Sequence, residues 1–271
     1  MGHDHSMSNP PLAERQWCIV GASVPGQGHI ERNIPCQDAH SIWRGPGGAI
    51  VIAVADGAGS AAHADLGSAE AVDLAVGAMW AHFLRRPGAR PNISVAVKHA
   101  FAVVRDELGR FAEQRSLPLE ALATTLTIVV IMPDCVAVAQ TGDGLVAAIN
   151  DAGQLTVLAK PQGGEHANET FFITGNGGAT PGFAEVYTSV SAVAVLTDGL
   201  LPMAADYKDH KPYARFFGPM FDAVLQSSDG TALQSQLEAF LQSERVNSRT
   251  NDDKTLVLAI RNDGRLASGR T

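Results

Sequence analysis

The stretch Ala49-Ile50-Val51-Ile52-Ala53-Val54-Ala55-Asp56-Gly57-Ala58-Gly59-Ser60 carries most of the information about the fold. It begins with an unbroken apolar run of valine, isoleucine and alanine, and the small residues that follow Asp56 are typical of a turn. This pattern predicts a short buried strand at residues 49–55 with an acidic residue at its end.

Similar apolar runs recur along the chain, and turn residues separate them. Pro133-Asp134 and Asp151-Ala152-Gly153 each lie between two such runs and predict tight hairpins. The other predicted strands are residues 17–23, 124–131, 135–140, 145–149, 154–158, 191–197 and 255–260.

Four segments have the period of a helix instead. For example, Ile93, Val97 and Ala100 recur at steps of three or four residues, which places them on one helix face. The predicted helices form two pairs, residues 66–85 with 92–114 and residues 213–226 with 232–245. Because strands come in runs and helices in pairs, the chain does not alternate strand and helix. We therefore predict an α+β fold, a sandwich of two antiparallel β-sheets flanked by helix pairs.

The composition is that of an acidic globular protein. The chain has 271 residues, 45% of them hydrophobic, which suffices for one domain with a sizeable core. Its 20 Lys and Arg against 28 Asp and Glu give a net charge of −8, which argues against binding to nucleic acids or anionic membranes. No apolar run is long enough to span a bilayer and no signal peptide is recognisable, so we expect a soluble, cytoplasmic protein. We expect a disordered N-terminus at residues 1–11, a single domain at 12–264 and a flexible tail at 265–271.

Acidic residues adjoin the ends of the predicted strands. An Asp-Gly pair by itself is a common turn signal. Here, however, several such acids can converge on one edge of a pair of sheets. The positions concerned are Asp38, Asp56-Gly57, Asp143-Gly144, Asp198-Gly199 and Asp252-Asp253.

Carboxylates that crowd together repel one another, and a hard divalent cation with oxygen ligands relieves that repulsion. Cys18, Cys36 and Cys135 have no zinc-site spacing, so the expected ions are Mg²⁺ or Mn²⁺. The Gly57 carbonyl can be a further ligand, because glycine lets the backbone approach closely. Two such ions about 3.5–4 Å apart can share a hydroxide that acts as a nucleophile.

Six motifs, in this order, resemble the PPM family, the metal-dependent type-2C protein serine/threonine phosphatases, and in particular its bacterial branch. The resemblance spans residues 18–260. It implies hydrolysis of phosphoserine and phosphothreonine by a metal-bridging hydroxide, with phosphoproteins made by a bacterial serine/threonine kinase as partners. The motifs are Gln37-Asp38-Ala39, Val54-Ala55-Asp56-Gly57-Ala58-Gly59-Ser60, Ala123-Thr124-Thr125-Leu126, Gly142-Asp143-Gly144, Leu196-Thr197-Asp198-Gly199 and Asp252-Asp253-Lys254-Thr255.

The resemblance also implies roles for the acids. Asp56 resembles the carboxylate that bridges two metals, with the Gly57 carbonyl on the second metal. Asp198 and Asp252 resemble ligands of the first metal, and Asp38 resembles the acid that holds metal-bound water. These four acids are the expected catalytic residues. Asp143 resembles the ligand of a third, weaker metal, and residues 163–170 occupy the place of the family's flap, to which we assign no catalytic role.

Two positions depart from the family pattern. Ala58 stands where eukaryotic relatives have a histidine that is thought to act as a general acid, which leaves His63 or a water on the third metal as substitutes. The family's phosphate-binding arginine has no clear counterpart, and Arg32 and His29 both remain candidates.

Two other functions compete with an active phosphoprotein phosphatase. One is a catalytically weak phosphoprotein-binding or scaffold relative, which the presence of Asp56, Asp198 and Asp252 disfavours. The other is a small-molecule phosphohydrolase with the same metal chemistry. Cys36 lies two residues before Asp38, and we interpret it as an inert packed thiol rather than a redox switch.

Overall fold

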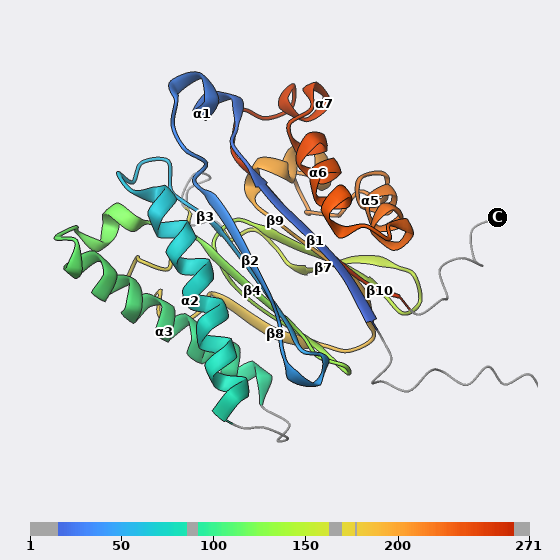
Figure 1. Cartoon of the computed structure of the whole chain (residues 1–271), viewed down its shortest axis with the longest axis horizontal. Coiled ribbons are helices and arrows are strands. Elements are labelled where there is room, and N and C mark those ends of the chain that lie inside the picture. Colours follow the sequence, from blue (N-terminus) through green and yellow to red (C-terminus); the bar gives the residue numbers. More distant parts are fainter. Residues whose placement is uncertain (1–15, 86–91, 163–169, 177, 263–271) are drawn as a thin grey trace, which may run out of the picture.

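Two five-stranded antiparallel sheets lie face to face, and helices cover the outer face of each (Figure 1). The computed structural model describes residues 16–85, 92–162, 170–176 and 178–262. The order of layers is helices, sheet, sheet, helices, which confirms the predicted α+β sandwich. The predicted tails at 1–11 and 265–271 lie outside the described residues.

Each sheet draws its strands from distant parts of the chain. The first sheet has the order β1 (Gln16–Val24), β10 (Lys254–Asn262), β9 (Val190–Leu196), β6 (Leu145–Asn150) and β7 (Leu155–Ala159). The second has the order β2 (Asp38–Arg44), β3 (Ile50–Asp56), β4 (Leu126–Ile131), β5 (Val136–Thr141) and β8 (Phe183–Tyr187).

Strand β3 is buried on both faces, and its side chains alternate between two cores. Ile52 and its alternate neighbours pack between the two sheets, against residues such as Val129 of β4. Ala53 and its alternate neighbours face the helices instead. This alternation follows from the two-residue period of a strand. Because one face meets a sheet and the other meets helices, the strand is apolar up to its last residue, Asp56.

Two long helices cover the second sheet, α2 (Ala64–Arg85) and α3 (Ile93–Gln114), while α5 (Ala214–Gln226) and α6 (Gly230–Leu241) cover the first. Capping residues fix where two of them begin. The Asn92 side chain accepts a hydrogen bond from Val95 N at 3.3 Å, and Asp229 Oδ1 accepts from Thr231 N at 2.9 Å. Three short helices complete the set: α1 (Gln27–Arg32), α4 (Leu201–Ala204) and α7 (Glu244–Asn247).

The structure corrects the predicted helix at residues 232–245. Helix α6 ends at Leu241 and α7 begins at Glu244, and the Ser243 hydroxyl donates to the Phe240 carbonyl between them at 2.6 Å. Such local side-chain bonds compete with the helical hydrogen bonds. Strands β2 and β8 were not predicted from the sequence, because both are edge strands with polar residues and without a long apolar run.

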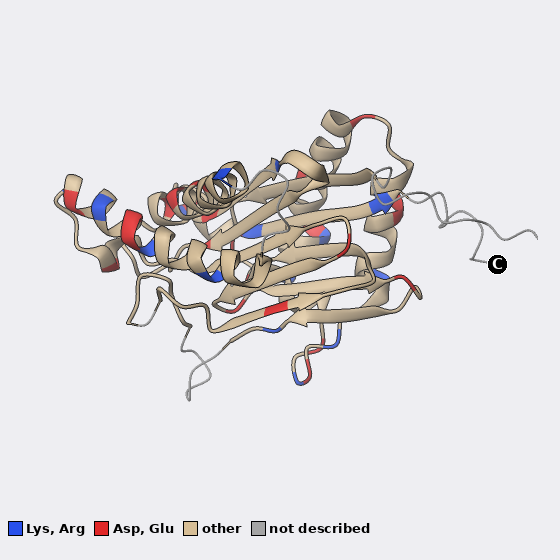
Figure 2. Cartoon of the chain, turned by 90° about the horizontal axis from the view of Figure 1, so that it is seen from below, with Lys and Arg blue, Asp and Glu red and all other residues tan. Residues whose placement is uncertain are grey.

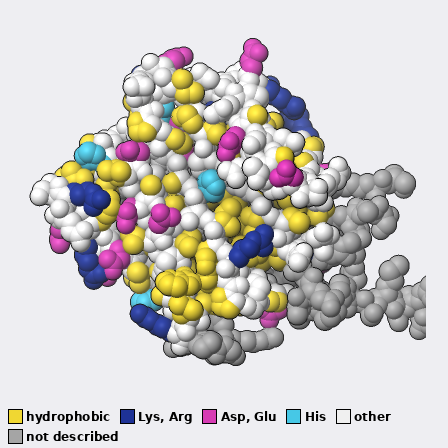
Figure 3. Space-filling view, in the orientation of Figure 1, with side chains coloured by type: hydrophobic (Ala, Val, Ile, Leu, Met, Phe, Trp, Pro, Cys, Tyr) yellow, Lys and Arg dark blue, Asp and Glu magenta, His cyan; other side chains and the backbone are white. Residues whose placement is uncertain are grey.

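Charged side chains lie mainly on helices and in loops, and few lie along the strands (Figure 2). None of the described helices is both long and apolar enough to cross a membrane. Apolar side chains reach the surface over the C-terminal half of α2, where Trp80 is 49% and Leu84 is 54% exposed (Figure 3).

The burial of side chains between the two sheets predicts which substitutions lower the free energy of unfolding most. Replacing Ile52, which is fully buried between the sheets, by alanine should lower the free energy of unfolding by about 2–5 kcal/mol. The matched change Ile30→Ala removes the same atoms from a side chain that is 50% exposed, and it should cost roughly 0.5 kcal/mol or less. Urea denaturation measures both. Equal losses would show that the contact between the sheets is not the main core.

Candidate active site

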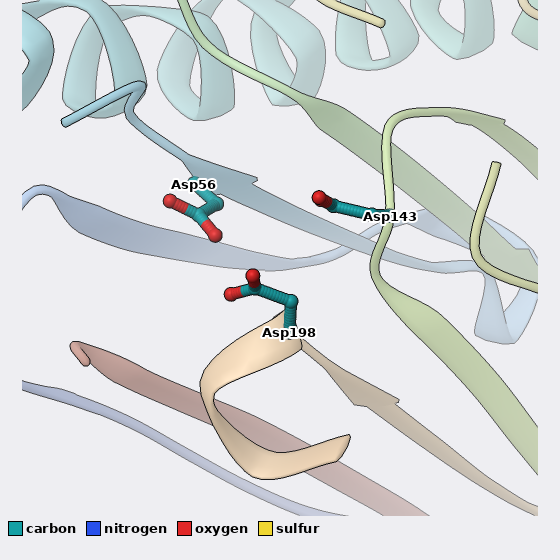
Figure 4. A group of neighbouring side chains, drawn as sticks. All are labelled: Asp56, Asp143 and Asp198. Carbon is teal, nitrogen blue, oxygen red and sulfur yellow. The ribbon is translucent and has the colours of Figure 1, made fainter. Parts of the chain in front are cut away.

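Three carboxylates from separate parts of the chain meet at one edge of the sandwich (Figure 4). Asp56 ends β3, Asp143 lies in the turn between β5 and β6, and Asp198 follows β9. One carboxylate oxygen of each lies within 4.8 Å of the corresponding oxygens of the other two. The predicted convergence of the strand-end acids therefore holds for these three residues.

Two threonines hold the backbone of Asp56. Its backbone N–H donates to the Thr125 hydroxyl at 2.9 Å, and its carbonyl accepts from Thr125 N at 2.8 Å. The Thr124 hydroxyl donates to the same carbonyl at 3.0 Å. These bonds explain why two threonines precede β4. They also fix the backbone of Asp56, from which the carboxylate extends into the site.

The glycines that follow Asp56 and Asp198 serve close packing. A Cβ atom at Gly57 would lie 2.5 Å from the Ala64 carbonyl oxygen, and one at Gly199 would lie 2.0 Å from the Asp253 carbonyl oxygen. Any side chain would push these segments apart. Gly199 thereby brings Asp198 close to the segment that contains Asp252 and Asp253.

Asp143 is held by a residue that sequence analysis did not single out. The Thr170 hydroxyl donates to Asp143 Oδ2 at 2.7 Å. The turn around Asp143 is itself braced by Gln140, which is fully buried and whose Nε2 donates to the carbonyls of Gly142 and Gly144. Of the predicted flap, residues 163–169 lie outside the described part of the chain.

Asp38 lies beside the three acids and is buried. It is the direct cross-strand neighbour of Asp56 in the pairing of β2 with β3. The Thr197 hydroxyl donates to Asp38 Oδ2 at 2.7 Å, whereas Asp38 Oδ1 and Asp198 Oδ1 are buried without a hydrogen-bond partner among the described residues. Buried polar atoms ordinarily have partners, so these oxygens fit a cation that would bind them.

The pKa values of Asp38, Asp56 and Asp198 are raised, because the site tolerates unneutralised negative charge poorly. Burial is the main cause of the raised pKa of Asp38 and of Asp56, and neighbouring carboxylates add to it. Burial and the charge of Asp143 raise the pKa of Asp198 to about 6. Oxygen donors of this kind suit Mg²⁺ or Mn²⁺.

The two neighbouring acids Asp252 and Asp253 lie in different environments. Asp253 is buried, and its carboxylate accepts from Gly26 N at 2.7 Å, from Gln37 N and from His29 Nδ1 at 2.9 Å. Asp252 is exposed, and its charge contributes to the raised pKa of Asp198. Asp252 therefore lies near the three-acid group without belonging to it, and its role as a metal ligand stays a prediction. Sequence analysis missed the anchoring role of Asp253.

The two candidates for phosphate contact are placed differently. Arg32 is exposed, and its Nε donates to the Gly28 carbonyl of its own helix at 2.7 Å. His29 is bound to Asp253, next to the predicted ligand Asp252. Of the two, His29 is thus the one that the structure ties to the acidic segment.

The other residues near the site have definite places. Ala58 is buried, and His63 is partly exposed immediately before α2 begins. The Cys36 thiol donates weakly to the Asp38 carbonyl at 3.5 Å, and burial together with the charges of Asp38 and Asp253 raises its pKa. A thiol with a raised pKa is a poor nucleophile, which supports the interpretation of Cys36 as inert.

The raised pKa of Asp198 predicts a pH dependence of stability without metal. Between its unfolded pKa of about 4 and its folded pKa of about 6, the folded state binds more protons, so stability falls as pH rises through this range. In EDTA, the free energy of unfolding of Asp198→Asn should therefore fall by roughly 1–3 kcal/mol less than that of wild type over this pH range. Denaturation at several pH values measures it, and the exposed control Asp73→Asn should keep the wild-type slope. Identical slopes for Asp198→Asn and wild type would contradict the crowding of these acids.

Comparison with known proteins agrees with the motifs. Residues 25–242 match the family model described as protein phosphatase 2C. The chain is 33% identical over 254 residues to serine/threonine-protein phosphatase 3 of Escherichia coli (strain K12), covering 90% of this chain and 98% of the relative. Two solved structures share the fold over 90% of this chain. They are the S. agalactiae serine/threonine phosphatase (TM-score 0.63, 15% identity, 99% of that chain) and the PstP catalytic domain in complex with 2 manganese ions (TM-score 0.59, 18% identity, 98% of that chain). The chain therefore belongs to the protein phosphatase 2C family of metal-dependent serine/threonine protein phosphatases.

Proposed function

We propose that this phosphatase removes phosphate from phosphoserine and phosphothreonine in proteins with two Mn²⁺ or Mg²⁺ ions bound at the acidic edge. The observation that carries the proposal is the meeting of Asp56, Asp143 and Asp198. With it go the buried Oδ1 atoms of Asp38 and Asp198, which have no hydrogen-bond partner among the described residues. A scaffold protein would not need to keep such a costly group of charges.

The ligand set is assigned from the geometry and the family motifs together. Asp56 would hold both ions, with the Gly57 carbonyl on one of them and Asp198 and Asp252 on the other. Asp143 would hold a third, weaker ion, and Asp38 would orient water at the site. The ions would supply positive charge for the phosphate and lower the pKa of water. The 2 manganese ions in the PstP structure support the choice of ion.

The chain's own residues would position the phosphoryl group. The Asp253 carboxylate fixes the His29 ring through Nδ1, which leaves Nε2 as the nitrogen that can contact a phosphate oxygen. We propose His29 for this contact ahead of Arg32. The same carboxylate binds Gly26 N and Gln37 N, so it holds both ends of the β1–β2 connection in place.

The substrates would be phosphoproteins made by a bacterial serine/threonine kinase. The likeness to the Escherichia coli phosphatase supports this assignment. A small-molecule phosphohydrolase shares the same ion chemistry, and the choice between the two depends on the ratio of rates on a phosphothreonine peptide and on small phosphate esters.

The first test of this function removes single ligands. Asp56→Asn and Asp198→Asn should each lower kcat on a phosphothreonine peptide by more than about tenfold, because each loses an ionised oxygen for the ions. EDTA should abolish wild-type turnover, and Mn²⁺ should restore it. The exposed acid Asp73 on α2 gives the matched control Asp73→Asn, which should keep full activity. Full turnover in excess EDTA would exclude the proposed function.

A second test asks what protonates the leaving group, because Ala58 cannot. A positioned acid is worth about 10²–10⁴-fold for an alkoxide and much less for an aryl oxide. We expect Asp143→Ala to lower the rate on a phosphothreonine peptide far more than the rate on an aryl phosphate, since Asp143 would hold the third ion. His63→Ala should lower neither rate selectively. A selective loss in His63→Ala would instead identify that histidine as the acid.

A further inference from the structure

A large apolar groove lies on the opposite side of the first sheet from the sheet interface. Its volume is about 560 Å³, and it is bordered by α5, α6 and α7. Val20 of β1 and Leu258 of β10 form its floor, and they are direct partners in the strand pairing. Phe216 of α5 and Leu237 of α6 line its walls. We call this space the α5–α6 groove.

The groove is separate from the acidic edge. Leu258 lies four residues along β10 from Lys254, which is roughly 13 Å of strand. Helix α7 connects the groove with this end of β10. The Nζ of the buried Lys254 donates to Oδ1 of Asn247, the last residue of α7, at 2.8 Å. None of the acids assigned to the ions lines the groove.

The charge at the groove is opposite to that of the chain. Arg215, Arg245 and Arg249 border the groove and are exposed, and no Asp or Glu is among the residues that line it. None of these arginines forms an ion pair within the described part of the chain. In a protein of net charge −8, three exposed cations around an apolar cavity are complementary to an anion with an apolar body.

The size of the groove points to a small molecule. Ligand cavities commonly measure about 300–1,000 Å³ and are mostly apolar with a few well-placed polar groups. Two methionines, Met203 and Met220, line this one, and methionine adapts its shape to flexible apolar ligands.

We propose that the α5–α6 groove binds a single-chain amphiphile with an anionic head group, of the class of a medium- or long-chain carboxylate. The chain of the ligand lies over Val20 and Leu258 between the two helices. Arg245 and Arg249 bind the head group at the groove's edge. This site is independent of the phosphatase reaction.

The test measures decanoate binding to the full-length protein by calorimetry, with decyltrimethylammonium and butanoate as probes of charge and chain length. Decanoate should bind, and each of the other two should bind at least about tenfold more weakly. The double variant Arg245→Glu with Arg249→Glu should weaken decanoate binding by about tenfold or more. A matched pair of exposed cations on the other helix layer, Arg85→Glu with Lys98→Glu, should leave the affinity within about twofold.

A second variant tests the cavity rather than the charge. Ala223→Trp adds a large side chain on the exposed face of α5 that borders the groove, and it should abolish decanoate binding while the metal-dependent phosphatase activity persists. The proposal is overturned if decanoate fails to bind up to about 1 mM, or if it binds both groove variants as well as wild type. It is also overturned if sedimentation shows a dimer that dissociates in the Arg245→Glu, Arg249→Glu variant, because a second copy would then occupy the groove.

Discussion

The repulsion among buried and half-buried carboxylates at one edge of the sandwich is the constraint on which the rest of the structure depends. Asp38 and Asp56 are directly opposite each other on neighbouring antiparallel strands, an arrangement that ordinarily destabilises a sheet. Asp198 and Asp143 add further negative charge from the other sheet and from a turn. The raised pKa values of Asp38, Asp56 and Asp198 reflect this crowding. Under the proposed function, the fold would keep these acids together as ligands for the ions.

Neutral hydrogen-bond donors hold the acids in place without cancelling their charge. Thr197 connects the two sheets, since it follows β9 of the first sheet and its hydroxyl donates to Asp38 at the start of β2 in the second. The same hydroxyl accepts from Thr255 N at 2.9 Å. In the same way, the Thr170 hydroxyl donates to the Asp143 carboxylate. Had lysines or arginines held these carboxylates, they would have competed with the ions for the same oxygens.

The sequence was sufficient to predict the elements whose burial is continuous. Strand β3 is apolar from Ile50 to Ala55 because a helix layer and a second sheet cover it, so its pattern could be recognised without a structure. The edge strand β2 could not be predicted, because it begins with the buried Asp38 and its half-buried side chains include His40 and Ser41. Asp56, Asp143 and Asp198 could be selected because each adjoins a strand and a glycine. The different roles of Asp252 and Asp253 could not be predicted, since they depend on which carboxylate faces the β1–β2 connection. The α5–α6 groove could not be predicted from the hydrophobic period of its helices. The same apolar faces also pack against the sheet, so the pattern does not reveal a space between the helices.

The buried oxygens of Asp38 and Asp198, which have no hydrogen-bond partner in the described part of the chain, have a consequence for the lifetime of the protein. Any ion that binds only the folded state stabilises it by RT ln(1 + [ion]/Kd), so the fraction of molecules that open transiently falls as the ion becomes more abundant. Proteases cleave the opened form, and their rate follows its population when reclosing is fast. Under the proposed function, the same carboxylates would thus make proteolytic degradation of this chain slower in a metal-replete cell than in a metal-starved one.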